Sequence, residues 1–173
     1  MNIYIWPAVV CVIAFIAWFS WNLTLDALWQ PTGVSTIKQM FDLVDLSESD
    51  VIYDLGCGDG RVLIEAARER GATGVGLEID PVRVWLARAR AAIAGLQGEV
   101  KIKRADMYCH PLNDADVVFL FLSSVANEKL AKKLNDELSP GARILSYYHE
   151  LPGREPVKVE KNEHDHELFL YKI

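Results

Sequence analysis

The sequence is poor in cysteine, and it carries fewer basic than acidic residues. Its 3 cysteines, Cys11, Cys57 and Cys109, are odd in number and form no C-x-x-C pattern, so we expect neither a disulfide framework nor a zinc site. With 18 Lys and Arg against 24 Asp and Glu, the formal net charge is −6, which leaves no broad basic face for a nucleic-acid backbone. These shortages predict a protein of a reducing compartment, without bound metal and without nucleic acid as a partner.

Charged residues are also missing from the N-terminal segment, residues 3–21. A helix over this segment would extend roughly 28 Å, close to the hydrocarbon thickness of a bilayer. Trp6, Trp18 and Trp21 lie near its ends, where indole rings favour the membrane interface. No basic residue precedes the segment and no small-residue cleavage site follows it, which argues against a signal peptide. The sequence predicts a transmembrane anchor at residues 1–22, a connector at 23–30 and one domain at 31–173.

The predicted domain alternates between strand and helix patterns, and 51% hydrophobic residues provide for one sizeable core. Apolar runs of strand length occupy residues 51–55, 74–79, 100–103, 117–122 and 143–148. Apolar residues at helical spacing mark residues 34–44, 61–70, 82–93 and 130–138. Two closing strands, 157–160 and 167–171, leave no room for a helix between them. The pattern predicts an α/β fold, a mostly parallel Rossmann-like sheet with the 117–122 strand at its middle, a C-terminal antiparallel hairpin and ligands at the carboxyl ends of the strands.

Three glycines at alternate positions, Gly56, Gly58 and Gly60, follow the first strand of the domain. Glycine permits positive φ and lets the backbone approach a ligand closely, and the following helix offers free amides. A dinucleotide-binding turn has the spacing G-x-G-x-x-G, whereas this turn is shorter and is flanked by Asp54 and Asp59. A carboxylate beside a pyrophosphate would be repelled, but Asp54 suits the amino group of a methionine moiety. The turn therefore predicts S-adenosylmethionine rather than NAD as the cofactor.

Four further residues complete the predicted cofactor site. Glu78 ends the second strand, where a carboxylate can accept hydrogen bonds from both ribose hydroxyls. Asp106 follows the third strand and is placed to accept from the adenine amine, and Met107 can pack on the ring. Thr32 is predicted to cap the first helix of the domain and to lie over the cofactor as part of a lid.

These motifs resemble class I methyltransferases, and the resemblance covers residues 31–173. Within that class, the chain resembles the small protein-lysine methyltransferases of archaea and their membrane-anchored relatives in animal mitochondria. The matching segments are residues 31–32, 53–61, 76–79, 119–128 and 138–143. The resemblance implies S-adenosylmethionine as cofactor and lysine side chains of proteins, including membrane proteins, as methyl acceptors. The D/N-P-P-Y/F turn typical of enzymes that methylate bases is replaced by Leu122-Ser123-Ser124, which again disfavours nucleic acid.

Methyl transfer by in-line displacement needs alignment of a neutral amine and no covalent nucleophile. An apolar, tyrosine-lined channel would favour the neutral amine over the ammonium form. Candidates for its walls follow the fourth and fifth strands: Ser123, Asn127, Tyr147 and His149. His164 and His166 fall in the predicted hairpin turn and are interpreted as solvated rather than as metal ligands.

Two other functions remain compatible with the sequence. One is methylation of a small molecule or lipid, such as a quinone, and the other is a cofactor-binding interaction module that does not catalyse. The anchor predicts a single-pass membrane protein, and the supply of S-adenosylmethionine from inside the cell predicts that the domain faces the cytoplasm or its equivalent.

Overall fold

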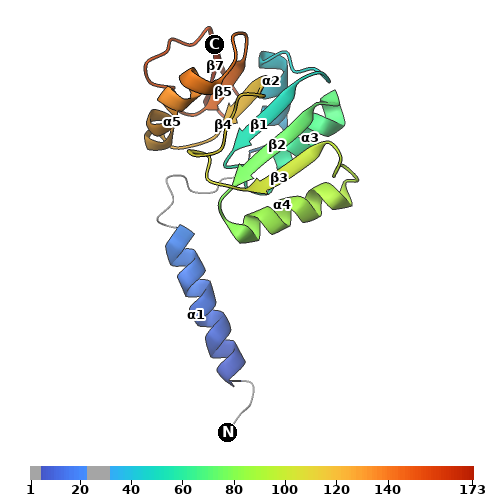
Figure 1. The fold of residues 1–173 in the computed structure, drawn as a ribbon, viewed down its shortest axis with the longest axis vertical. Coiled ribbons are helices and arrows are strands. Elements are labelled where there is room, and N and C mark those ends of the chain that lie inside the picture. The colour runs from blue at the N-terminus through green and yellow to red at the C-terminus, as the bar shows by residue number, and fades with distance from the viewer. Residues whose placement is uncertain (1–4, 23–31) are drawn as a thin grey trace.

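The computed structural model describes residues 5–22 and 32–173, and in these residues seven strands form one mixed sheet (Figure 1). The strand order is β3-β2-β1-β4-β5-β7-β6. The strands are β1 Val51–Leu55, β2 Thr73–Glu78, β3 Val100–Arg104, β4 Val117–Leu120, β5 Arg143–Tyr147, β6 Lys158–Lys161 and β7 Glu167–Lys172. The first five strands run parallel, and β7 pairs antiparallel with both β5 and β6. The central β4 and the C-terminal hairpin confirm the predicted topology.

Helices cover both faces of this sheet. They are α2 Val34–Leu43, α3 Arg61–Arg70, α4 Pro81–Ile93 and α5 Ser124–Glu137, and α1 Ile5–Asn22 precedes them. Apolar residues of α2, α3 and α4 pack in one core cluster, whereas those of α5 pack in the other. The strands between the two layers are buried on both sides, which explains why β4 is apolar at every position.

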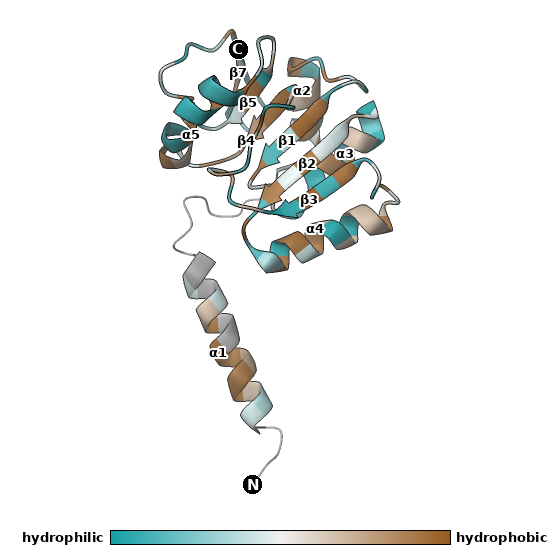
Figure 2. Ribbon diagram, viewed as in Figure 1, coloured by the Kyte–Doolittle hydropathy of each residue, from teal (hydrophilic) through white to brown (hydrophobic). Residues whose placement is uncertain are grey.

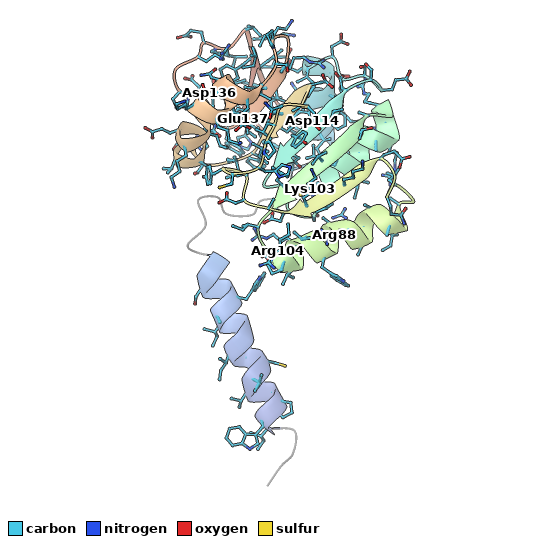
Figure 3. All side chains as sticks on the ribbon, viewed as in Figure 1. Arg88, Lys103, Arg104, Asp114, Asp136 and Glu137 are labelled. Carbon is cyan, nitrogen blue, oxygen red and sulfur yellow. The ribbon has the colours of Figure 1, made fainter. Side chains whose placement is uncertain are left out.

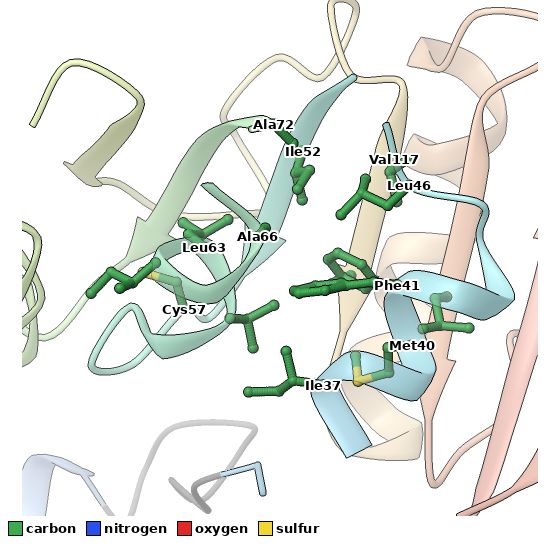
Figure 4. Close-up of a cluster of buried hydrophobic side chains, with 14 of the residues drawn as sticks. Ile37, Met40, Phe41, Leu46, Ile52, Cys57, Leu63, Ala66, Ala72 and Val117 are labelled. Atoms are coloured by element: carbon green, nitrogen blue, oxygen red, sulfur yellow. The ribbon is translucent and has the colours of Figure 1, made fainter. Parts of the chain in front are cut away.

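The first core cluster is built around Phe41 of α2 and Phe119 of β4 (Figure 4), whose ring centroids lie 6.1 Å apart. Ile37 and Met40 come from the same helix, and both are buried. Burial of such a side chain stabilises the fold by about 1.5–3 kcal/mol. Their helical spacing attaches α2 to the sheet beside β1 and β4, the two strands that carry the candidate site.

Local features set the ends of several elements. β5 stops at Tyr147, one residue before the predicted end, because Tyr148 adopts a left-handed backbone with φ of 75°. Gly60 and Gly71, both in the left-handed region, bound α3. The prediction that Thr32 caps α2 is wrong: Gly33 occupies the N-cap position and makes no side-chain hydrogen bond. Thr32 is instead buried, and its carbonyl accepts a hydrogen bond from Arg61 at 3.2 Å.

The prediction of a membrane-spanning anchor at residues 3–21 is wrong. The helix formed there is α1, which has 18 residues. Apolar residues predominate in the coloured part of α1 (Figure 2), and Trp18 Nε1 donates to both carboxylate oxygens of Asp80, a residue of the domain, at 3.2 and 3.0 Å. In the described part of the chain, no helix has the length and apolar character needed to cross a bilayer.

The expected localisation as a single-pass membrane protein with a cytoplasmic domain is therefore corrected as well. The predicted connector, residues 23–30, lies outside the described residues.

The edge strand β3 is protected by charge (Figure 3). Arg88 of α4 donates from Nε and Nη2 to the carbonyl of Ile102 at 3.0 and 2.8 Å. Lys103 lies on the same strand, with Nζ 3.1 Å from His110 Nε2. Charged side chains on an edge discourage pairing with a further strand, so the sheet ends at β3.

Candidate active site

The glycine turn follows β1 and is held against β2 by the backbone. The amides of Gly56 and Cys57 both donate to the Leu77 carbonyl, at 2.8 and 3.1 Å. Gly56, Gly58 and Gly60 have φ values of 79°, 54° and 74°, a region that side chains with a Cβ disfavour. The backbone conformation of the turn therefore favours glycine at these three positions.

Gly76 of β2 is needed for a different reason, close packing. A Cβ at this position would lie 2.6 Å from Cys57 Sγ, 2.8 Å from Ile102 Cδ1 and 2.9 Å from Leu63 Cδ1. Only glycine lets the turn approach β2 this closely. The sequence of the turn does not reveal this requirement, because it arises from contacts between elements.

Asp54 lies in β1 between Gly76 of β2 and Phe119 of β4. Burial, followed by the negative charges of Glu78 and Asp59, raises the pKa of Asp54 to about 7. Each of these influences opposes the ionised carboxylate, and the cost of burying an unpaired charge is high. The site thus favours a cationic group beside Asp54, which is what the amino end of S-adenosylmethionine supplies.

Glu78 ends β2 and accepts hydrogen bonds from two backbone amides. Its Oε2 accepts from Gly58 at 3.0 Å, and its Oε1 accepts from Asp80 at 2.9 Å. The side chain is buried, and that burial raises its pKa. The structure thus joins Glu78 to the glycine turn, as the predicted site requires, although the sequence did not predict these backbone contacts.

Asp59 is neutralised by arginines. Arg61 donates to its carboxylate from Nε at 3.0 Å and from Nη2 at 2.8 Å, and Arg90 of α4 forms a second ion pair. Burial alone would raise the pKa of Asp59, but the hydrogen bonds and charges of Arg61 and the charge of Arg90 outweigh burial and lower it. Asp59 therefore fastens the glycine turn to two helices, and a direct cofactor contact stays a prediction.

Asp106 and Met107 follow β3, at the same edge of the sheet as Glu78. The amide of Ala105 donates to the Glu78 carbonyl at 3.1 Å, which joins the two strand ends. Asp106 is exposed, and its Oδ1 accepts from the Tyr108 amide at 2.9 Å. Met107 is half-buried against the second core cluster. The structure thus places both residues next to the end of β2 that carries Glu78, while their contacts with adenine stay predictions.

The candidates after β4 and β5 have different surroundings. Ser123 is the N-cap of α5, and its Oγ accepts from the Ala126 amide at 3.2 Å. Asn127 is fully buried, and its Nδ2 lies 3.2 Å from the carbonyl oxygens of His149 and Glu150. The side chain of His149 is exposed. Ser123 and Asn127 therefore shape the backbone here, and only Tyr147 brings a hydroxyl into a polar network.

Tyr147 belongs to an aromatic group that sequence reasoning found only in part. Phe121, Tyr147, Tyr148 and His166 have ring centroids between 4.3 and 6.1 Å apart for five of their pairs. His166 Nδ1 lies 3.1 Å from the Tyr147 hydroxyl, and Nε2 lies 3.1 Å from the Tyr148 hydroxyl. The interpretation of His166 as a solvated turn residue is thus wrong. In the sequence, His166 comes just before the hydrophobic residues of β7. This position does not reveal that its ring contacts residues at the end of β5.

The network continues to α2 through Asn162. Its Nδ2 lies 2.9 Å from the Tyr147 hydroxyl and 3.0 Å from Thr36 Oγ1. Burial, the largest influence, raises the pKa of Tyr147, which keeps this phenol protonated. Three separate parts of the chain thus meet at the carboxyl ends of β4 and β5, which lie one and two strands away from β1 and its glycine turn.

Comparison with known proteins identifies relatives of this chain. The sequence model of the ANTKMT methyltransferase domain matches residues 54–158. A protein-lysine N-methyltransferase of Saccharolobus islandicus is 36% identical over 147 residues, covering 83% of this chain and 91% of the relative. The adenine nucleotide translocase lysine N-methyltransferase of Mus musculus is 38% identical over 108 residues, covering 62% of this chain and 47% of the relative. The match thus spans about half the length of the mouse protein.

Among solved structures, an RNA methyltransferase from Salinibacter ruber in complex with S-adenosyl-L-homocysteine superposes with a TM-score of 0.80. It is 37% identical, and the match covers 83% of this chain and 94% of that chain. The match extends beyond the glycine turn to most of the domain, and the product of the cofactor is bound in that relative. The chain therefore belongs to the ANTKMT methyltransferase domain family and is an S-adenosylmethionine-dependent methyltransferase with the class I fold.

Proposed function

We propose that this enzyme methylates lysine side chains of proteins. The observation that carries the proposal is the aromatic group of Phe121, Tyr147 and Tyr148 at the carboxyl ends of β4 and β5. The names of the relatives from Saccharolobus islandicus and Mus musculus support the same acceptor, since both are lysine N-methyltransferases.

The acidic residues of the predicted cofactor site suit the two ends of the cofactor. We assign Asp54 to the amino group of the methionine moiety, because burial and the negative charges of Glu78 and Asp59 all oppose its ionised form. We assign Glu78 to the ribose hydroxyls and Asp106 to the adenine amine, with Met107 against the ring and Thr32 on the α2 side. When bound, S-adenosylmethionine supplies a methyl group on a sulfonium, ready for in-line displacement.

The acceptor must arrive as a neutral amine, because an ammonium has no lone pair. With a lysine pKa of about 10.4, deprotonation at pH 7 costs roughly 4.6 kcal/mol. Half-buried aromatic walls lower this cost by disfavouring the charged form. Phe121 and Tyr148 stack with an interplanar angle of 7° and a centroid distance of 5.4 Å, and thus offer a flat apolar surface for the lysine methylenes.

The strand register supports a position of this surface near the cofactor turn. Leu55 of β1 pairs with Leu120 of β4, and Leu120 pairs with Ser146 of β5. Phe121 and Tyr147 are the next residues of their strands, so they lie at the level of Gly56. Neighbouring strands are about 4.8 Å apart, so Phe121 lies one strand spacing and Tyr147 two strand spacings from Gly56.

The rival acceptors are RNA, which the name of the Salinibacter ruber enzyme gives as its substrate, and a lipid or other small molecule. The net charge of −6 disfavours RNA. The experiment is to incubate the full chain with S-adenosylmethionine labelled at the methyl group, together with a total extract of host cells. Protein, RNA and lipid fractions are then separated and counted, and labelled proteins are digested for mass spectrometry.

Methyl groups on lysine in the protein fraction are the expected result, and Asp54→Asn, which cannot balance the cationic amino group, should remove them. Label confined to RNA or to the lipid fraction would overturn the lysine proposal while leaving the methyltransferase assignment intact. Digestion of the extract with ribonuclease before the reaction separates direct RNA methylation from methylation of RNA-bound proteins.

A further inference from the structure

We propose that Tyr148 and His166 form a proton relay for the acceptor amine, in which the Tyr148 hydroxyl contacts the amine and His166 receives the proton. The inference rests on the proposed lysine acceptor. It assigns a task to two residues that the cofactor chemistry does not use and that the sequence did not single out together.

The first observation is the backbone of Tyr148. Its φ of 75° lies in the left-handed region, which is unfavourable for a bulky residue and is commonly retained at functional sites. Three contacts hold it there: its amide donates to the Glu167 carbonyl at 3.0 Å, its ring stacks on Phe121, and its hydroxyl meets His166.

The second observation is the arrangement of donors and acceptors around His166. The side-chain NH₂ group of Asn162 can only donate, so the Tyr147 oxygen accepts from it. The same oxygen can accept from His166 Nδ1–H at 3.1 Å. His166 Nε2 is then unprotonated and accepts the Tyr148 hydroxyl proton at 3.1 Å. After receiving a further proton, the imidazolium donates to a phenol oxygen at each end, so both charge states of His166 are satisfied.

The imidazole is also fixed in place. The backbone amide of His166 donates to Asn162 Oδ1 at 2.9 Å, and the Asn162 amide donates to the His166 carbonyl at 2.9 Å. The titratable side chains around the His166 ring are Tyr147 and Tyr148 from β5 and His164 from its own turn. No carboxylate of the described residues is among these ring contacts, so the charge that His166 gains is stabilised by oxygens and aromatic faces.

The proposed step conserves atoms and charge. The N–H bond of the lysine ammonium breaks and its proton bonds to the Tyr148 oxygen, while the former hydroxyl proton of Tyr148 bonds to His166 Nε2. The products are a neutral amine, an unchanged tyrosine and an imidazolium. After methyl transfer, the half-buried His166 returns the proton to water. Tyr148 is thus a catalytic residue, and His166 acts through it.

The test is the pH profile of methyl transfer for the wild-type chain, Tyr148→Phe and His166→Gln, measured from about pH 6.5 to about pH 10. Poly-L-lysine and host protein extract serve as acceptors, at a saturating concentration of S-adenosylmethionine. General acid–base groups typically contribute about 10²–10⁴-fold, so we expect each variant to be about 100-fold slower near pH 7. The deficit should shrink to under about tenfold near pH 10, where much of the lysine is already neutral.

The matched control is His164→Gln, because His164 is exposed in the same turn and bonds through its backbone amide to Asn162. It should keep the wild-type profile. The double variant Tyr148→Phe/His166→Gln should be no slower than either single variant, since both break one relay. Affinity for S-adenosyl-L-homocysteine, measured by calorimetry, should be unchanged in all of them and shows that each variant is folded.

Three results would overturn the relay. A deficit of the same size at every pH would make the two residues structural, and wild-type rates in Tyr148→Phe would remove the hydroxyl from the reaction. If the wild-type chain methylates no lysine in either acceptor, the proposed function itself fails and the relay fails with it. Since Tyr148→Phe deletes a single oxygen and keeps the ring, it tests the inference even if His166→Gln does not fold.

Discussion

The two halves of the candidate site are built differently. At the ends of β1 and β2, glycines and buried carboxylates follow one another closely in the sequence, and backbone amides hold them. At the ends of β4 and β5, the polar network combines Thr36, Tyr147, Tyr148, Asn162 and His166, which come from three distant segments. The cofactor half is built from neighbouring residues of the sequence, whereas the proposed acceptor half is assembled by tertiary packing.

The strongest test of this comparison is Asp54→Asn in the cofactor half. Loss of the carboxylate removes a charge-assisted contact to the amino group of the ligand, which is worth about 1.5–3 kcal/mol. We expect affinity for S-adenosyl-L-homocysteine to fall by up to about 100-fold, as measured by isothermal titration calorimetry. Asp106→Asn is the control at the exposed end of the site and should weaken binding less. Equal losses for both variants would contradict the central role given to Asp54.

A second test is steric and uses Gly76→Ala. The added Cβ would meet Cys57, Ile102 and Leu63 at less than 3.0 Å, and overpacking of this kind costs about 1–3 kcal/mol. Chemical denaturation should show this loss, with weaker ligand binding because the turn is displaced. Gly98→Ala is the matched control, since nothing lies within 4 Å of its added Cβ. Identical stability of the two variants would show that the turn does not depend on close packing against β2.

The pH dependence of binding follows from Asp54, whose pKa is raised from 3.8 to about 7. The ligand needs the ionised carboxylate, so affinity for S-adenosyl-L-homocysteine should be about tenfold weaker at pH 6 than at pH 7.5. Between these two pKa values the folded protein holds a proton on Asp54 that the unfolded chain has lost. The unliganded protein should therefore lose stability as pH rises from about 4 to 8.

Asp54→Asn provides the control for both pH effects. At about pH 8 the unliganded variant should melt at a higher temperature than the wild-type chain, and the difference should vanish near pH 4, where wild-type Asp54 is neutral. A variant that melts lower at pH 8 would show that the buried charge is already compensated in the unliganded protein.

The smallest expected effect comes from Ser123→Ala in the acceptor half. Ser123 caps α5, so its loss should cost about 1 kcal/mol of stability and leave turnover nearly unchanged. Ser124→Ala, at the first helical position, should change neither property. If Ser123→Ala greatly reduced methyl transfer while keeping the wild-type melting temperature, Ser123 would take a direct part in the reaction.

The elements of the domain could be predicted because their signals are local. A few neighbouring residues suffice to predict the glycine turn, the apolar strand β4 and the apolar stripes of helices α3 and α4. Membership of the class I fold followed from their order. The acidic residues of the cofactor half were found for the same reason, since each directly follows or ends a predicted strand.

What could not be predicted depends on contacts between distant segments. The role of His166 requires that the β6–β7 turn lies against the end of β5, and the left-handed Tyr148 follows from that packing. The apolar run at residues 3–21 had a strong local signal for a membrane span, but that signal does not reveal the contact of Trp18 with Asp80 of the domain.

In the proposed scheme the two halves of the site act separately, one holding the cofactor and the other preparing the acceptor amine. The most direct measurement is methyl transfer to lysine by Tyr148→Phe at pH 7, at a concentration of S-adenosylmethionine shown by calorimetry to saturate the variant. We predict wild-type affinity for the cofactor with turnover reduced about 100-fold. Unchanged turnover, or a loss of cofactor affinity that accounts for the reduced rate, would contradict the separation of the two halves.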